Sequence, residues 1–276
     1  MTPAGRCPPT PSEGLAVFDF MYDLPEWAMF VSCVLLVGGL SAAALALMYA
    51  LRRLWPPGSH GPNMVNTMLS GILLPTGMVI TFVAADIWQQ DAKGRTAVEK
   101  EAVAVADTMR VVKFLPADLR EQVTGVLDDY IREVVENEWP LMGEGRASQI
   151  AEDQLETLMV ISVRIEAGTD GLGVQRAAEA LRRYTMAIEK ARNQRLLVSH
   201  SRVMPTKWIA VLVLLFVAAC VLSELHMTQR RPLILSLTLF SLGFGATLYL
   251  IASFDRPFTG TTIIEPTSLS VLLVRG

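Results

Sequence analysis

Residues 64–85 read MVNTMLSGILLPTGMVITFVAA, an apolar stretch without a charged side chain. A helix needs about 20 apolar residues to cross the hydrocarbon core of a membrane, so this stretch predicts a membrane span from Met64 to about Trp88. Beyond it, apolar residues recur in alternating steps of four and three, at Val98, Ala102, Val105, Met109 and Val112. That spacing is typical of one apolar helix face. We therefore expect a single helical rod, Asn63–Phe114, that leaves the bilayer and enters a water-exposed domain.

The composition of the whole chain also indicates residence in a membrane. Its 276 residues are 51% hydrophobic and the mean hydropathy is +0.38, which is too apolar for an ordinary soluble protein. The net charge is −3, and no basic block suggests nucleic acid as a partner. The three cysteines have neither the spacing of a disulfide framework nor that of metal ligands. We expect no cofactor and no metal.

Four apolar runs organise the chain. They predict spans at Trp27–Leu51, Met64–Trp88, Trp208–Ser223 and Pro232–Phe254. The third run is short for a crossing, so either the bilayer is locally thinner or the helix extends back through Met204 and Pro205. The expected domains are an N-terminal arm (1–26), transmembrane helices 1 and 2 (27–88), a soluble helical domain (89–206), transmembrane helices 3 and 4 (207–254) and an extended C-terminal tail (255–276). The predicted fold class is an all-α membrane protein with four transmembrane helices and a helical soluble insertion between spans two and three.

Aromatic and basic residues bear on how the spans are placed. Trp27, Trp88, Trp208 and Phe254 each stand at a span end, and four crossings would bring all of them to one membrane interface, together with both termini. The lysines and arginines do not decide the orientation. Their total favours the soluble domain in the cytoplasm, whereas their density in the two short loops favours the reverse.

The soluble domain is expected to contain four helices. The first continues span two, the second runs over Ala117–Leu141, the third over Ser148–Ile165, and the fourth from the turn at 168–173 toward Pro205. No nucleophile–base pair is visible in the sequence, so we do not expect an enzyme. The acidic group Asp128, Asp129, Glu133 and Glu136 is interpreted as a solvated helix face.

Span two carries small and polar residues near one face of an otherwise apolar helix. Two interpretations remain open: close packing between helices, and the lining of a water-filled path. The pore-lining candidates are Asn63, Asn66, Ser70, Leu73, Leu74, Gly77 and Thr81.

Four local motifs occur in a fixed order along the chain. They are Trp88-x-x-Asp91-Ala92 with Glu99 and Glu101; Tyr130 followed by Glu138-Trp139-Pro140-Leu141-Met142-x-x-Gly145; Arg192-x-x-Arg195-Leu196 with Pro205-x-x-Trp208; and Asp255-Arg256-Pro257-Phe258-Thr259-Gly260. Together they resemble the bacterial bestrophin-like domain family, over roughly Trp27 to Leu273. The family-motif residues singled out are Trp88, Asp91, Glu138, Trp139, Arg195, Pro205, Asp255, Arg256, Pro257 and Phe258.

The resemblance implies an oligomeric ion channel. Bestrophins are pentameric anion channels with cytosolic termini, and their second span lines the pore. The expected partners are thus the lipid bilayer, inorganic ions and further copies of the chain. The expected location is the bacterial inner membrane, with the soluble domain and both termini in the cytoplasm.

The sequence departs from bestrophins in the pore. Their necks carry aromatic rings, whereas span two has only Phe82 before Trp88, so an aliphatic gate at Leu73, Leu74 or Ile80 is expected. The alternative function is a non-conducting membrane scaffold or sensor whose helical domain binds a partner protein. In either case we expect Trp139 to pack the second soluble helix on the first, and Asp255 and Arg256 to cap the last span.

Overall fold

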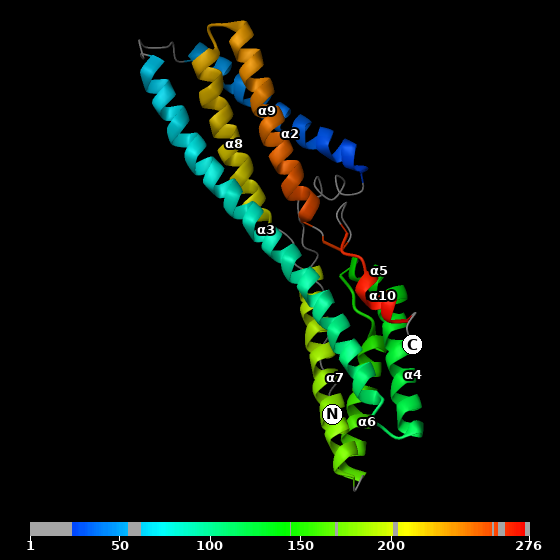
Figure 1. Ribbon diagram of the computed structural model, residues 1–276. Helices are drawn as coiled ribbons and strands as arrows, with labels where there is room; N and C mark the ends of the chain where they lie inside the picture. Colours follow the sequence, from blue (N-terminus) through cyan, green and yellow to red (C-terminus); the bar gives the residue numbers. More distant parts are fainter. Residues whose placement is uncertain are drawn as a thin grey trace, which may run out of the picture. The chain divides into compact units, whose positions relative to one another are not determined.

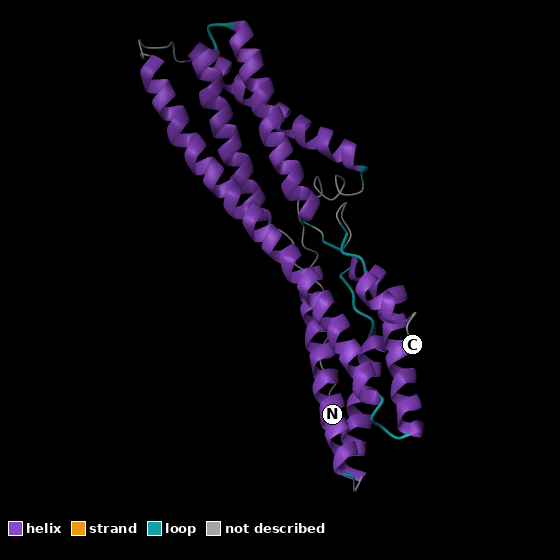
Figure 2. Ribbon diagram, viewed as in Figure 1, coloured by secondary structure: helices purple, strands orange, loops and turns teal. Residues whose placement is uncertain are grey.

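The computed structural model describes residues 24–54, 62–143, 145–168, 171–200, 204–255, 257–258 and 263–273, with the side chains of 62–67 left out. The regular secondary structure of these residues is helical throughout, which confirms the all-α fold class (Figures 1 and 2). The chain divides into two compact units. One combines residues 1–83 with 203–252, and the other combines 84–202 with 253–276.

The first unit contains the membrane helices. They are α2 (Glu26–Leu54), the first part of α3 (Pro62–Val112), α8 (Pro205–His226) and α9 (Arg230–Phe254), and each holds a stretch long and apolar enough to cross a membrane. Helix α8 is longer than the apolar run predicted. Pro205 occupies its first turn, where a missing amide costs nothing, and its 22 residues reach about 33 Å. The helix therefore extends beyond the short apolar run at both ends, which makes it long enough to cross the membrane.

Helix α3 confirms the predicted continuous rod. Its 51 residues include Pro75 and run without interruption to Val112. The amides of Phe114 and Leu115 then bond three residues back, to Val111 and Val112, at 3.0 Å. Pro116 disfavours helical geometry in the residue before it, which explains why the rod ends just short of Phe114.

Helices α2 and α9 approach each other closely. A Cβ added at Gly245 would lie 2.7 Å from the Cα of Val34, so glycine is the residue that lets these backbones meet. The hydroxyls of Ser41 and Ser241 lie 3.3 Å apart in the same contact. This close helix contact lies on α9, whereas the sequence analysis considered close packing, as one of two interpretations, on span two.

The second unit is a helical bundle. It contains the remainder of α3 with α4 (Ala117–Glu133), η1 (Val134–Glu138), α5 (Trp139–Gly143), α6 (Gln149–Gly168), α7 (Leu172–Ser199) and α10 (Thr267–Leu273). Its apolar core includes the fully buried side chains of Val105, Leu127, Ile131, Leu158 and Leu181. Helices α4 and α6, and α6 and α7, pack along each other (Figure 1).

Two expectations for this unit need correction. The predicted helix Ala117–Leu141 contains a π-helical turn, η1. Pro140 follows it, supplies no amide and crowds the preceding turn, which favours a local widening of the helix. The predicted extended tail is also wrong in part, because it ends in helix α10, which buries Leu269 in the core.

The aromatic belt is incomplete. Trp27 and Trp88 are 72% and 48% exposed, as contact with lipid headgroups requires. Trp208 is only 7% exposed, so its indole packs inside the protein and that part of the prediction was wrong.

We expect Gly245→Ala to destabilise the protein by about 1–3 kcal/mol, because the new methyl group would clash with the backbone of Val34, which cannot move as a flexible side chain can. Gly243→Ala on the same helix is the matched control, since nothing lies within 4 Å of its Cβ position. Thermal denaturation in detergent should show a lower melting temperature for Gly245→Ala alone. Equal melting temperatures for the two variants would contradict the close α2–α9 contact.

Candidate pore helix and buried charge network

The candidate pore face of α3 is open within the chain. Ser70, Gly77 and Thr81 are exposed, and the Thr81 hydroxyl donates to the Gly77 carbonyl at 2.8 Å. That bond satisfies the Thr81 hydroxyl within the helix. The side chains of Asn63 and Asn66 lie outside the described set.

Glycine contacts bear on the two interpretations of this face. No atom lies within 4 Å of a Cβ placed at Gly71 or Gly77, in contrast to Gly245 on α9. Close packing inside one chain therefore does not explain the small residues of α3. Whatever covers them lies outside the chain, and it can be water, lipid or a second chain.

The aliphatic gate candidates separate by burial. Leu74 is 70% exposed and falls in the row Ser70, Leu74, Gly77 and Thr81, at steps of four, three and four. Leu73 is half-buried. Ile80 is 5% exposed and faces the protein interior, so its inclusion among the gate candidates was wrong.

A second assembly, which we call the charge network, lies in the core of the other unit. It consists of Glu101 on α3, Tyr130 on α4, Glu138 in η1, and Arg192 and Arg195 on α7. None of the five is more than 2% exposed. Three parts of the chain that are distant in sequence, α3, α4 with η1, and α7, thus place their polar side chains in one apolar core.

Arg195 is the centre of the charge network. Its guanidinium donates to Glu101 through Nε at 2.7 Å and through Nη2 at 3.0 Å. The same Nη2 donates to Glu138 at 2.8 Å. The Tyr130 hydroxyl donates to Glu101 Oε1 at 2.7 Å, the same oxygen that accepts from Arg195 Nη2. Arg195 therefore joins α3 to η1 through two carboxylates.

Arg192 completes the pairing. It donates to Glu138 Oε2 from Nη2 at 2.6 Å and from Nε at 3.1 Å, and to the Ser148 carbonyl at 2.8 Å. The Ser148 amide in turn donates to Glu138. Two arginines thus balance two glutamates, which is the condition under which buried charge is tolerated.

The environment shifts the titration of these groups. Burial alone would raise the pKa of Glu138, but the hydrogen bond from Arg192 and the charges of Arg195 and Arg192 outweigh it and lower that pKa. Burial would lower the pKa of Arg195, and the charge of Glu101 and its hydrogen bonds raise it instead. Burial and the charge of Glu101 hold the pKa of Tyr130 well above its ordinary value, so Tyr130 stays neutral. The lowered pKa of Glu138 and the raised pKa of Arg195 keep both groups ionised at neutral pH.

Trp139 connects the charge network to the C-terminal segment. Its ring lies under the Arg195 guanidinium, 4.9 Å from ring centroid to Cζ, and its Nε1 donates to the Ile264 carbonyl at 3.0 Å. The ring of Phe258 meets it edge-on at 5.8 Å. Trp139 therefore fixes the segment after the last span, whereas the sequence analysis expected it to join the first two soluble helices.

The remaining family-motif residues are spread over both units. Asp91 pairs with Arg95 at 2.9 Å on α3, and Asp255 is buried. The Pro257 carbonyl accepts the Ile264 amide at 2.8 Å. Arg256 lies outside the described residues, so its expected capping role stays a prediction.

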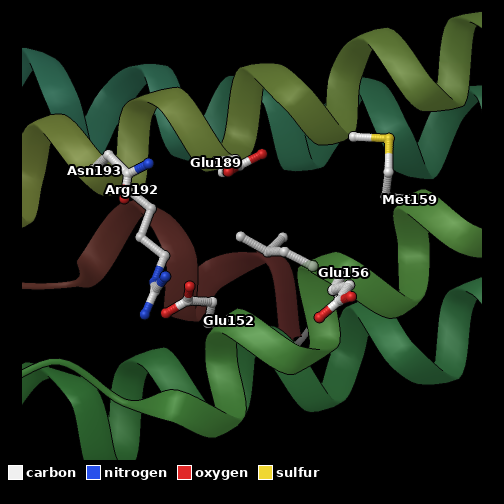
Figure 3. Close-up of a pocket in the computed structure, with 7 residues that line it drawn as sticks. Glu152, Glu156, Met159, Glu189, Arg192 and Asn193 are labelled. Atoms are coloured by element: carbon white, nitrogen blue, oxygen red, sulfur yellow. The ribbon is translucent and has the colours of Figure 1, made fainter. Parts of the chain in front are cut away.

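An acid-lined pocket lies between α6 and α7 on the other side of Arg192. Figure 3 shows Glu152, Glu156 and Glu189 around it, with Asn193 and Arg192 at one end. Within the described part of the chain, no group of three or more His, Cys, Asp or Glu side chains is arranged to hold a metal ion. The pocket is a solvated, charged groove beside the charge network.

The sequence motifs contain every member of the charge network, but they do not reveal the network itself. Glu101, Tyr130, Glu138, Arg192 and Arg195 all stand in the quoted motifs, but their mutual pairing was not expected. The usable signal was charge on buried helix faces. Glu101 falls three or four residues from Val98 and Val105, on the apolar side of α3, and a charge there requires a buried partner.

These observations define an all-helical integral membrane protein with four spanning helices and a helical insertion built around buried ion pairs. The chain belongs to the Bestrophin-like domain family, whose profile matches residues 38–269. No curated protein matches it.

Solved structures share the fold. A mutant form of a bacterial bestrophin homologue from Klebsiella pneumoniae superposes with a TM-score of 0.66 at 12% identity, over 89% of this chain and 96% of that one. A second mutant of that homologue gives 0.66 at 13% identity with the same coverage. A structure described as a membrane protein gives 0.65 at 13% identity, again over 89% and 96%.

We expect Glu101→Gln to lower the stability of the protein by about 3 kcal/mol or more, because it leaves buried positive charge without its counter-charge. Glu99→Gln removes the same charge two residues away on the exposed side of α3, and should be nearly neutral. Melting temperatures of the two variants in detergent make the comparison. An equally small change of melting temperature in the two variants would show that the buried Arg195 tolerates the loss of the Glu101 charge.

The charge network should also make stability depend on pH. The folded pKa of Glu138 is below its ordinary value of 4.5, so its contribution is present above pH 4.5 and is lost as the pH falls through the folded pKa. The melting temperature of the wild type should therefore fall steeply below pH 4.5. Glu138→Gln should start lower and show a shallower fall, while Glu136→Gln, at an exposed site, should follow the wild type.

Proposed function

We propose that this chain is the subunit of a bestrophin-like ion channel, in which ions permeate passively along α3. The observation that carries the proposal is the open polar row of Ser70, Gly77 and Thr81 on a membrane-spanning helix. A row left uncovered by its own chain is open to lipid, to water or to a second chain, and small and polar residues suit the last two. Membership of the bestrophin-like family supports water beside the row, as in a pore.

The proposal requires several copies of the chain. One α3 offers one open face, and a path across the membrane closes only when several such faces surround an axis. We propose a homo-oligomer, with five copies by analogy with bestrophins. The permeant ions are proposed to be anions on the same analogy.

Leu74 is the proposed constriction. Its side chain is the large apolar group within the open row, and a ring of such groups can gate a pore by excluding water. The neighbouring Ser70, Gly77 and Thr81 would provide the wetted stretches on either side of it.

The proposed orientation places the second unit and both termini in the cytoplasm of a bacterial cell, at the inner membrane. The family analogy supports it. A cysteine introduced at the exposed Thr157 of α6 should then be protected from membrane-impermeant thiol reagents in intact spheroplasts. Labelling there at the rate of a periplasmic control would reverse the orientation.

We expect Leu74→Ser to increase ion flux through liposomes that contain the purified protein, because it removes the apolar barrier. The control is Leu239→Ser, at a 59% exposed position on α9, which should leave the flux unchanged. Thr81→Lys should shift the selectivity toward anions. Reversal-potential measurements in planar bilayers give both quantities.

Two results together would contradict the channel. They are the absence of flux from the wild-type protein, and a mass in detergent that corresponds to a monomer or dimer. Those results would favour the alternative function, a non-conducting scaffold or sensor. Its exposed α3 residues, including Met78 and Phe82, would then pack against another helix.

A further inference from the structure

One end of the membrane-spanning unit is strongly basic. Arg52 and Arg53 stand in the last turn of α2, and Arg230 and Arg231 open α9. The C-terminal ends of α2 and α8 and the first turn of α9 lie together at this end of the bundle (Figure 1). Among the described residues 50–54 and 222–235 at this end, Glu224 is the one acidic residue.

Glu224 is already paired in a salt bridge. Glu224 on α8 accepts two bonds from Arg52, at 2.8 Å from Nη2 and 3.3 Å from Nε, and both side chains are about 30% exposed. This pair ties α2 to α8. It leaves Arg53, Arg230 and Arg231 exposed and, across the described residues, without a salt bridge. Four arginines against one glutamate give this end three unbalanced positive charges.

Exposed apolar side chains continue directly from these arginines. On α9, Ile234 and Leu235 are 66% and 61% exposed and lie one turn beyond Arg230 and Arg231, on the same face. On α2, Leu54 is 81% exposed beside Arg53. A ligand that satisfies both surfaces combines a phosphate anion with hydrocarbon chains.

We propose that Arg53, Arg230 and Arg231 form a binding site for the phosphodiester headgroup of an anionic phospholipid. The guanidinium groups would pair with phosphate oxygens, for which their planar donor geometry is suited, and the acyl chains would lie along Ile234 and Leu235. A free phosphate ion would meet only the charges and would leave the apolar face uncovered. The site is independent of ion conduction and would hold for a scaffold as well.

Native mass spectrometry of the full chain in detergent tests the site, with phosphatidylglycerol, phosphatidylcholine and inorganic phosphate as probes. The wild type should retain phosphatidylglycerol in preference to phosphatidylcholine. Each arginine near an anionic headgroup contributes about fivefold to binding, so replacing all three by glutamine should weaken phosphatidylglycerol binding by about a hundredfold. Replacement of all three by lysine should retain most of the binding.

The matched control removes three exposed arginines of the other unit, with Arg164, Arg176 and Arg183 changed to glutamine. It alters the net charge equally and should leave lipid binding unchanged. The single variant Arg231→Gln, with an expected fivefold loss, replaces the triple variant if the latter does not fold.

Three outcomes would overturn the proposal. One is equal retention of the two lipids by the wild type. Another is an equal loss of binding in the variant and in the control. The third is displacement of phosphatidylglycerol by inorganic phosphate at comparable concentration, which would assign the arginines to a free anion.

Discussion

The salt bridges of Arg195 to Glu101 and Glu138 are the interaction on which the soluble unit depends. They join α3 to η1 through α7, at a point where all three side chains are fully buried. A buried ion pair adds little net stability relative to apolar residues, but removal of one partner lowers the stability strongly. The arrangement therefore acts mainly on specificity. A helix register that misplaces any one of these side chains leaves a charge unpaired in the core.

The charge network also involves the π-helical turn η1 and the segment after the last span. The π-helical turn ends at Glu138, which binds both arginines, and the next residue, Trp139, lies under Arg195 at the start of α5. Trp139 then reaches the Ile264 carbonyl beyond the last span. The C-terminal segment is thus held by the same group of side chains that orders α3, α4 and α7.

Helix α3 serves both units with one uninterrupted backbone. Its first part carries the open row of Ser70, Gly77 and Thr81, and its second part supplies Glu101 to the charge network. A rod of this length has no hinge in its hydrogen-bonding pattern apart from Pro75. The proposed permeation path and the buried ion pairs are therefore parts of one helix, and the pairs define the environment of that helix after it leaves the membrane.

The sequence by itself determined the four spans and the long helix, because apolar length and period are local properties that need no knowledge of partners. Its four motifs carried the resemblance to the family. It also placed Glu138, Trp139 and Arg195 in motifs. Tertiary structure alone decided that these residues meet Glu101 and Tyr130, since the pairing joins positions up to 94 residues apart. It likewise decided that Ile80 and Trp208 are buried and that Gly245 meets the backbone of Val34, because the side of a helix that is covered depends on its neighbours.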